Sequence, residues 1–64
     1  MAELYRRLVM ILRENGCTLV RSGKGSHEIW FSPVSLRHVT VPRSTKSRHT
    51  ANEVLKEAGL PKSF

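Results

Sequence analysis

The fold is decided by residues 16–31, which are GCTLVRSGKGSHEIWF. This segment holds two short runs rich in β-branched and aromatic residues, 17–21 and 27–31, on either side of a turn with two glycines. Glycine permits the backbone angles of a tight hairpin, so the sequence predicts two antiparallel strands joined by residues 22–26. Pro33 has no N–H to donate to a sheet, which predicts that residues 32–35 end the second strand.

A third strand is expected over residues 37–41, RHVTV, where Pro42 stops it. Side chains alternate between the two faces of a strand. Counting along the strands places Ile29, Phe31, Val39 and Val41 on one face, and Glu28, Trp30, His38 and Thr40 on the other. By the same count, His27 shares the face of Ile29 and lies opposite His38.

Two helices are expected to flank the strands. From residue 3 to 15, apolar residues recur at helical spacing, and Gly16 follows where a left-handed cap ends a helix. Residues 50–53, TANE, fit a capping box that starts a second helix, which Gly59 ends. Leu60 is expected to fold back onto this helix, and residues 61–64 to form a loose tail. The apolar stripes are Leu4, Leu8, Ile11 and Leu12 in the first helix, and Ala51, Val54, Leu55 and Ala58 in the second.

The predicted order is α-β-β-β-α, a two-layer α+β sandwich with a three-stranded antiparallel sheet and two helices on one face. This is the architecture of the double-stranded-RNA-binding domain. At 64 residues the chain is too short for two cores, so residues 1–64 are expected to form one domain. Cys17 is the only cysteine, which excludes a disulfide within the chain and favours a small buried apolar role.

The charge balance favours a polyanionic partner. Eleven Lys and Arg face five acidic residues, for a net charge of +6 and a pI of about 10.5. The chain has no Asp, which argues against the carboxylate-rich centre of a two-metal nuclease. No apolar run approaches a membrane span and the first residues are charged, so a cytoplasmic protein without membrane association is expected.

Two segments are candidate functional sites. His27 follows Gly25 and Ser26 at the turn edge, where an imidazole can exchange protons near neutral pH. An ordinary surface histidine after a hairpin fits the same spacing. Arg43, Lys46 and Arg48, with His49, precede the second helix, whose free N–H groups favour phosphate. A solvated loop is the alternative there.

Other residues carry weaker signals. His27, His38 and His49 lack the spacing of metal ligands, so no metal site is expected. Trp30 could stack a base or anchor a protein contact, although packing beneath the Pro33 loop is the commoner fate of a lone tryptophan.

In their order along the chain, several motifs resemble the HicA family, the toxins of HicA/HicB toxin–antitoxin systems. The matching motifs are the glycine after the first helix, Arg21, the run GSHEIW at 25–30, VTVP at 39–42, and VLKEAGL at 54–60. The resemblance implies an mRNA interferase, a small endoribonuclease that cuts messenger RNA and arrests growth. It also implies that His27 is catalytic and that a HicB antitoxin blocks the enzyme.

The mechanism expected from this resemblance needs no metal or other cofactor. The ribose 2′-OH attacks the adjacent phosphodiester, with His27 as general base or as general acid. Cations stabilise the charge on the phosphorane, and His49, Lys24 or water remain open as the second proton-transfer group. The cations expected to contact RNA are Lys24, Arg43, Lys46 and Arg48.

Two other functions remain open from the sequence. A non-catalytic RNA-binding module uses the same fold and charge, and a pure protein-interaction module matches the charge to an acidic partner. Only the nuclease requires one specific histidine. A neighbouring reading frame for an antitoxin-like protein favours the toxin interpretation.

Overall fold

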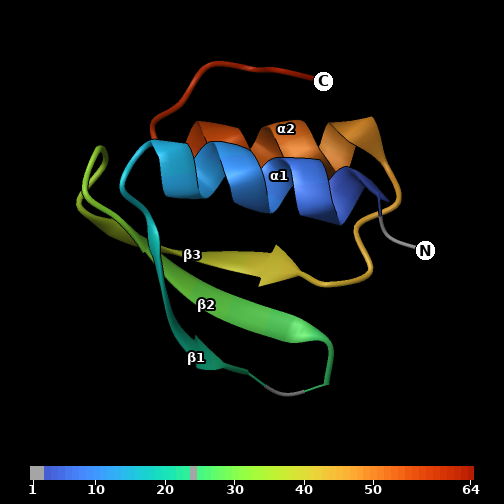
Figure 1. Ribbon diagram of the computed structural model, residues 1–64, viewed down its shortest axis with the longest axis horizontal. Helices are drawn as coiled ribbons and strands as arrows, with labels where there is room; N and C mark the ends of the chain where they lie inside the picture. Colours follow the sequence, from blue (N-terminus) through green and yellow to red (C-terminus); the bar gives the residue numbers. More distant parts are fainter. Residues whose placement is uncertain (1–2, 24) are drawn as a thin grey trace.

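Two helices pack on one side of a three-stranded sheet in the computed structural model, which describes residues 3–23 and 25–64 (Figure 1). The order α-β-β-β-α predicted from the sequence is confirmed. The elements are α1 (Glu3–Glu14), β1 (Thr18–Ser22), β2 (His27–Ser32), β3 (Arg37–Pro42) and α2 (Arg48–Glu57). Among the described residues, no helix has the length and apolar character needed to span a membrane.

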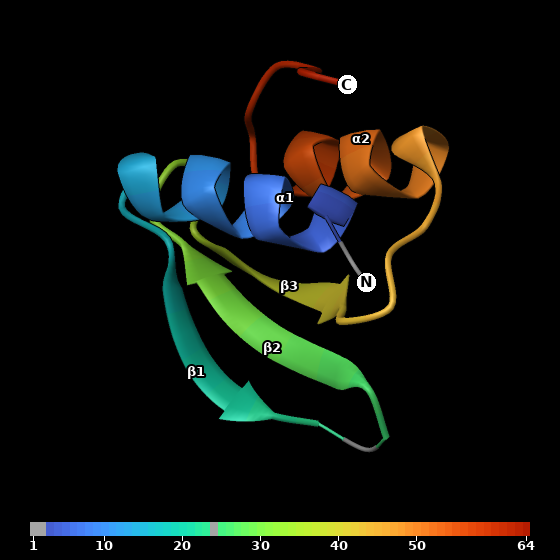
Figure 2. The same cartoon turned by 45° about the vertical axis from the view of Figure 1, so that its right-hand side comes forward.

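The sheet is antiparallel, with β2 between β1 and β3. Both helices lie on the same face, so the sandwich has two layers and its other sheet face is uncovered (Figure 2). Strand β1 extends away from the helices, and all five of its residues are exposed. The covered part of the sheet is therefore formed mainly by β2 and β3.

Helix α1 ends through the glycine cap predicted from the sequence. Gly16 has a φ of +85°, which a residue with a Cβ rarely adopts. The Cys17 N–H then donates to the Leu12 carbonyl over 2.9 Å, which closes the last turn. This tight reversal sends the chain directly into β1, and Cys17 is buried at 4% exposure as a small apolar residue.

The predicted faces of β2 were wrong, although those of Val39 and Val41 in β3 were right. Trp30 pairs with Val39 and Glu28 with Val41, so Glu28 and Trp30 face the helices. A shift of one residue in strand alternation exchanges the two faces. Burying Trp30 removes more apolar surface from water than burying Ile29, and Glu28 is buried beside hydrogen-bond donors.

One continuous core lies between the helices and the sheet. Tyr5, Val9, Ile11, Leu60 and Phe64 are partly buried against it, which confirms that Leu60 folds back. Leu4 and Ile11 are half-buried, and the other predicted stripe residues are buried. The buried apolar residues are Leu8, Leu12, Cys17, Trp30, Val39, Val41, Ala51, Val54, Leu55 and Ala58.

Helix α2 begins earlier than predicted. Ser47, not Thr50, is the N-cap, and its hydroxyl accepts from the N–H groups of His49 and Thr50. Serine satisfies free N–H groups as well as threonine does, and the cap at Ser47 places Arg48 and His49 in the first turn. Residues 50–53 lie inside the helix, so the predicted capping box was wrong.

The C-terminal segment is held in place rather than forming the predicted loose tail. The Asn52 side chain accepts hydrogen bonds from the N–H groups of Ser63 and Phe64, both at 3.2 Å, and donates to the Phe64 carbonyl. The guanidinium of Arg7 lies 5.4 Å from the centre of the Phe64 ring. These contacts, with the packing of Phe64 on the core, fix the segment over the helices.

Candidate functional site

His27 is the first residue of β2 and lies at the end of the sheet, on the face that the helices leave uncovered. Its side chain is exposed and it pairs with Pro42 of β3. Its carbonyl accepts a hydrogen bond from the Gly23 N–H over 2.7 Å. A Cβ at Gly23 would lie 3.2 Å from that carbonyl oxygen, so the hairpin closes tightly at His27 because residue 23 is glycine.

The basic loop, residues 43–47, leaves the same end of the sheet. The Arg43 N–H donates to the Ser26 carbonyl over 2.6 Å, which extends the pairing of β2 and β3 by one bond. The buried Thr45 donates from its hydroxyl and its N–H to the Pro42 carbonyl. The loop is therefore fixed to the sheet by defined hydrogen bonds.

Exposed cations follow along this loop into α2. Lys46, Arg48 and His49 are all exposed, and the first turn of α2 contains no acidic residue. The start of α2 lies at the same end of the molecule as the start of β2 and the end of β3 (Figures 1 and 2). The structure thus brings Lys46 and Arg48 to the His27 end of the sheet. Lys24, the fourth predicted RNA-binding residue, lies outside the described residues.

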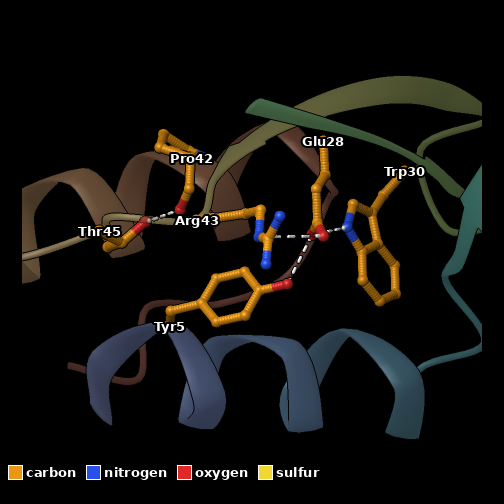
Figure 3. Close-up of polar contacts among 6 residues, drawn as sticks. All are labelled: Tyr5, Glu28, Trp30, Pro42, Arg43 and Thr45. Carbon is orange, nitrogen blue, oxygen red and sulfur yellow. Dashed lines mark hydrogen bonds and ion pairs between the residues drawn. The ribbon is translucent and has the colours of Figure 1, made fainter. Parts of the chain in front are cut away.

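Arg43 points to the other side of the sheet from His27. Its Nε lies 3.8 Å from Glu28 Oε2, on the helix side, and its side chain is 60% exposed (Figure 3). Glu28 engages Nε, and a guanidinium has further N–H groups that can reach a phosphate. Arg43 therefore lies before α2, as predicted, and its guanidinium already contacts Glu28.

Glu28 is the centre of a polar cluster beneath the site, with Tyr5, Trp30 and Arg43 around it (Figure 3). Its Oε1 accepts from the Tyr5 hydroxyl over 2.6 Å and from Trp30 Nε1 over 3.1 Å. A carboxylate side chain exposed to only 9% is costly to bury unless it is hydrogen-bonded, and here it has two donors and a nearby cation. The cluster links α1, β2 and the basic loop.

The phenol of Tyr5 is strongly affected by this environment. Burial, the hydrogen bond to Glu28 and the charge of Glu28 together raise the pKa of Tyr5 from 10 to about 12. Arg43 and Arg13 lower it by a smaller amount. Tyr5 therefore remains a neutral hydrogen-bond donor across the physiological range.

The three histidines are spread over the molecule. Phe31 pairs with His38, so His38 lies on the uncovered face with His27, and the predicted separation of these two histidines was wrong. His49 lies in α2, which packs on the other face. Across the described part of the chain, no three His, Cys, Asp or Glu residues are grouped where they could hold a metal ion.

One cation of the site was missed from the sequence, and the structure decides among the alternatives left open for Trp30. Arg21 pairs with Ile29 and so lies on the face of His27, a cation that the sequence predictions did not include among the RNA contacts. Trp30 is buried at 1% exposure and donates to Glu28, which excludes it as an exposed stacking platform. The adjacent Phe31 takes the outward position instead, as the strand register requires.

One of the comparisons with known proteins found a match. The family model described as the HicA toxin of bacterial toxin–antitoxin systems matches residues 5–60. The chain belongs to the HicA toxin family. The match runs from Tyr5 in α1 to Leu60 after α2, so it includes every strand and the His27 hairpin. No curated protein and no solved structure gave a match in the same comparisons.

The HicA family consists of toxins from toxin–antitoxin systems, in which a toxin is paired with an antitoxin. An antitoxin is therefore the partner that the family implies. The resemblance predicted from the sequence is confirmed at this level.

Proposed function

We propose that this HicA-family protein is an endoribonuclease, an mRNA interferase that cuts messenger RNA with His27 as its catalytic histidine. The observation that carries the proposal is the exposed position of His27 at the sheet end where Lys46 and Arg48 also lie. An accessible imidazole, with phosphate-binding cations at the same end of the fold, suits RNA cleavage without a metal.

The proposed reaction is an internal transesterification. The ribose 2′-oxygen attacks the adjacent phosphorus, the bond from phosphorus to the 5′-oxygen breaks, and the products are a 2′,3′-cyclic phosphate and a 5′-hydroxyl. His27 either takes the proton from the 2′-OH or gives a proton to the leaving oxygen. A positioned group of this kind typically contributes about 10²–10⁴-fold to the rate. The second proton-transfer group remains open among His49, Lys24 and water.

Cations hold the phosphate chain in the proposed complex. Lys46 and Arg48 bind backbone phosphates at the start of α2, where the helix N-terminus adds a partial positive charge. Arg43 and Lys24 complete the proposed RNA-binding set from the sequence. Arg43 does so from the helix side of the sheet, with its guanidinium oriented by Glu28.

A HicB-like antitoxin is the proposed inhibitor and the only route to a larger assembly. The toxin carries a net charge of +6, so the antitoxin surface that contacts it is expected to be acidic. Covering His27 and the basic loop would block the surface that RNA uses. The protein is expected to act in the cytoplasm, where messenger RNA and the antitoxin are made.

The test is cleavage of a defined RNA by the purified wild-type toxin and by its His27→Ala variant. We expect the wild type to cut, with a 2′,3′-cyclic phosphate identified by mass spectrometry, and the folded variant to lose activity. A matched substrate with one 2′-deoxy nucleotide at the cleaved position should remain intact. Wild-type activity should persist in EDTA.

Three results would contradict the proposal. They are cleavage by folded His27→Ala at the wild-type rate, activity that EDTA abolishes and magnesium restores, and RNA that binds without being cut. The last result would favour the non-catalytic RNA-binding module. Circular dichroism of both proteins shows whether the variant is folded.

A further inference from the structure

The sheet has an open face, which we define by the outward side chains of Arg21, His27, Ile29, Phe31, His38 and Thr40. Neither α1 nor α2 covers it, because both pack on the opposite side (Figure 2). Phe31 and Ile29 are only partly buried there, and His38 and Thr40 are exposed. The open face therefore presents aromatic and apolar groups on the side that carries the proposed catalytic histidine.

Phe31 and His38 form a defined aromatic pair on this face. Their ring centroids are 5.4 Å apart and the rings are inclined at 64°, an edge-to-face arrangement. Cross-strand pairing of β2 and β3 fixes both side chains on the same side of the sheet. Since an edge contact leaves ring surface unused, a further planar group can stack on the pair.

We propose that Phe31 and His38 form a nucleobase-stacking subsite for single-stranded RNA, close to the nucleotide that His27 cleaves. This inference rests on the proposed ribonuclease function, and it names how the substrate lies on the enzyme. The base of one nucleotide stacks on the Phe31–His38 pair, while the cleaved nucleotide lies at His27. Stacking requires an unpaired base, so the substrate at this face is single-stranded.

The spacing along β2 fits a short run of RNA. His27 and Phe31 are four residues apart on one strand, and a strand rises ~3.3 Å per residue, so they are ~13 Å apart. A stacked nucleic-acid strand rises ~3.4 Å per nucleotide, so about four nucleotides cover this distance, and fewer when the chain is extended. The stacked base therefore lies within about four nucleotides of the cleavage point.

The charges on the open face favour RNA over a protein as the occupant. Arg21 lies on this face beside Ile29, and the single acidic residue of the three strands, Glu28, is buried on the other face. Single-stranded RNA supplies both groups that the face can bind, because its phosphates pair with Arg21 and its bases stack on Phe31 and His38. An acidic protein surface would supply a partner for Arg21 but none for Phe31 and His38.

The test measures RNA binding without cleavage. The probe is a fluorescent single-stranded 12-nucleotide RNA, and its affinity is measured by anisotropy with the His27→Ala variant as background. Phe31→Leu keeps the apolar character and removes the ring. Stacking of one base corresponds to roughly 5- to 150-fold in affinity, so we expect a loss within this range. The slope of log affinity against log salt should not change, because no phosphate contact is removed.

The chain offers a matched control for this variant. Phe64 is the other phenylalanine, and it packs on the helix side with Arg7 over its ring. Phe64→Leu makes the same chemical change away from the open face, so it should leave RNA affinity unchanged. Phe31→Tyr, which keeps a ring, should retain most of the affinity. His38→Ala alters an exposed residue of the same pair and should also weaken binding. It provides the test if Phe31→Leu does not fold.

An abasic scan of the RNA separates stacking from a general structural effect. One abasic position should weaken binding to the background protein and have little further effect in Phe31→Leu, because the same contact is already lost. The proposal is overturned if folded Phe31→Leu and His38→Ala bind RNA normally. It is equally overturned if no abasic position is coupled to Phe31, or if the variants lose only antitoxin binding. If the coupled position is found but wild-type toxin never cuts RNA, the stacking subsite stands and the nuclease proposal fails.

Discussion

The Tyr5 hydroxyl donates to Glu28 Oε1 over 2.6 Å and joins the first helix to the strand that begins with His27. These residues are 23 positions apart in the chain, so the bond forms only when α1 packs on the sheet. Trp30 Nε1 donates to the same oxygen, and Arg43 approaches the other one. Glu28 therefore connects the packing of α1 to the sheet end that carries the candidate site.

Replacement of Glu28 should separate its role as a hydrogen-bond acceptor from its charge. Glu28→Ala leaves the donors of Tyr5 and Trp30 without an acceptor and opens a cavity, so we expect a loss of ~2–4 kcal/mol in the free energy of unfolding. Glu28→Gln keeps an acceptor oxygen and should lose less. Urea denaturation followed by the fluorescence of Trp30, the only tryptophan, measures both.

The exposed Glu53 of α2 provides the control for this pair of variants. Glu53→Ala should change the free energy of unfolding by less than ~0.5 kcal/mol, because it lies away from buried partners. Equal effects of Glu28→Ala and Glu53→Ala would show that the cluster does not stabilise the fold.

Titration of Tyr5 should show the effect of its burial directly. It is the only tyrosine, so phenolate absorbance near 295 nm reports it alone, with a midpoint near 12 in the folded protein and near 10 in urea. Between these values the unfolded state binds fewer protons than the folded state. The free energy of unfolding therefore falls as the pH rises from 10 to 12.

Tyr5→Phe is the control for that pH dependence, because lysines titrate in the same range. The difference in stability between wild type and variant should be constant below pH 10 and should shrink as the pH approaches 12. A wild-type phenol that titrates near 10 in the folded protein would contradict the hydrogen bond to Glu28.

The order of elements was predictable because local signals agree with the tertiary packing. The apolar stripe of α1, the glycine cap at Gly16 and the stop at Pro42 each act within a few residues. The position of His27 at the start of β2 followed from the same local signals. His27 does share the face of Ile29, but the sequence had grouped that face with Val39 and Val41, so its place on the uncovered face was not predicted.

The errors came from interactions that connect distant parts of the chain. An acidic residue at 28 predicts an outward side chain, and its burial depends on a donor from Tyr5 and a cation from Arg43. Residues 61–64 were predicted to be loose because the residue that holds them, Asn52, lies twelve positions before Phe64. For the same reason, the faces of β2 could not be read from alternation alone.

The N-cap of α2 was also predicted wrongly, and here the misread signal is local. Mutation can check which residue is the cap. Ser47→Ala removes the acceptor for the N–H groups of His49 and Thr50, and should lower the free energy of unfolding by ~1 kcal/mol. Thr50→Ala, at the residue that the sequence predicted as the cap, should have a smaller effect. The opposite order in urea denaturation would restore the predicted capping box.

Leu36 should be a site where substitution stabilises the protein. It adopts a φ of +57° in the turn between β2 and β3, and the residue is 76% exposed. A left-handed conformation costs a residue with a Cβ about 1–2 kcal/mol, while little apolar packing is lost on replacement. Leu36→Gly should therefore raise the free energy of unfolding by ~0.5–1 kcal/mol. The exposed Val34 in the same turn is the control, and Val34→Gly should not stabilise.

The contribution of the basic loop to RNA binding can be measured by its salt dependence. Each cation that neutralises a phosphate releases counterions, so removing two such contacts should reduce the slope of log affinity against log salt by about 1.4 for single-stranded RNA. The double variant Lys46→Ala and Arg48→Ala should show this reduction in a His27→Ala background. Lys56→Ala with Lys62→Ala is the matched control, because it removes the same charge from the end of α2 and the segment after it. We expect that control to keep most of the wild-type slope. Equal slopes for the two double variants would show that RNA does not contact the start of α2, and Arg6, Arg7 and Arg13 of α1 would then be the next cations to replace.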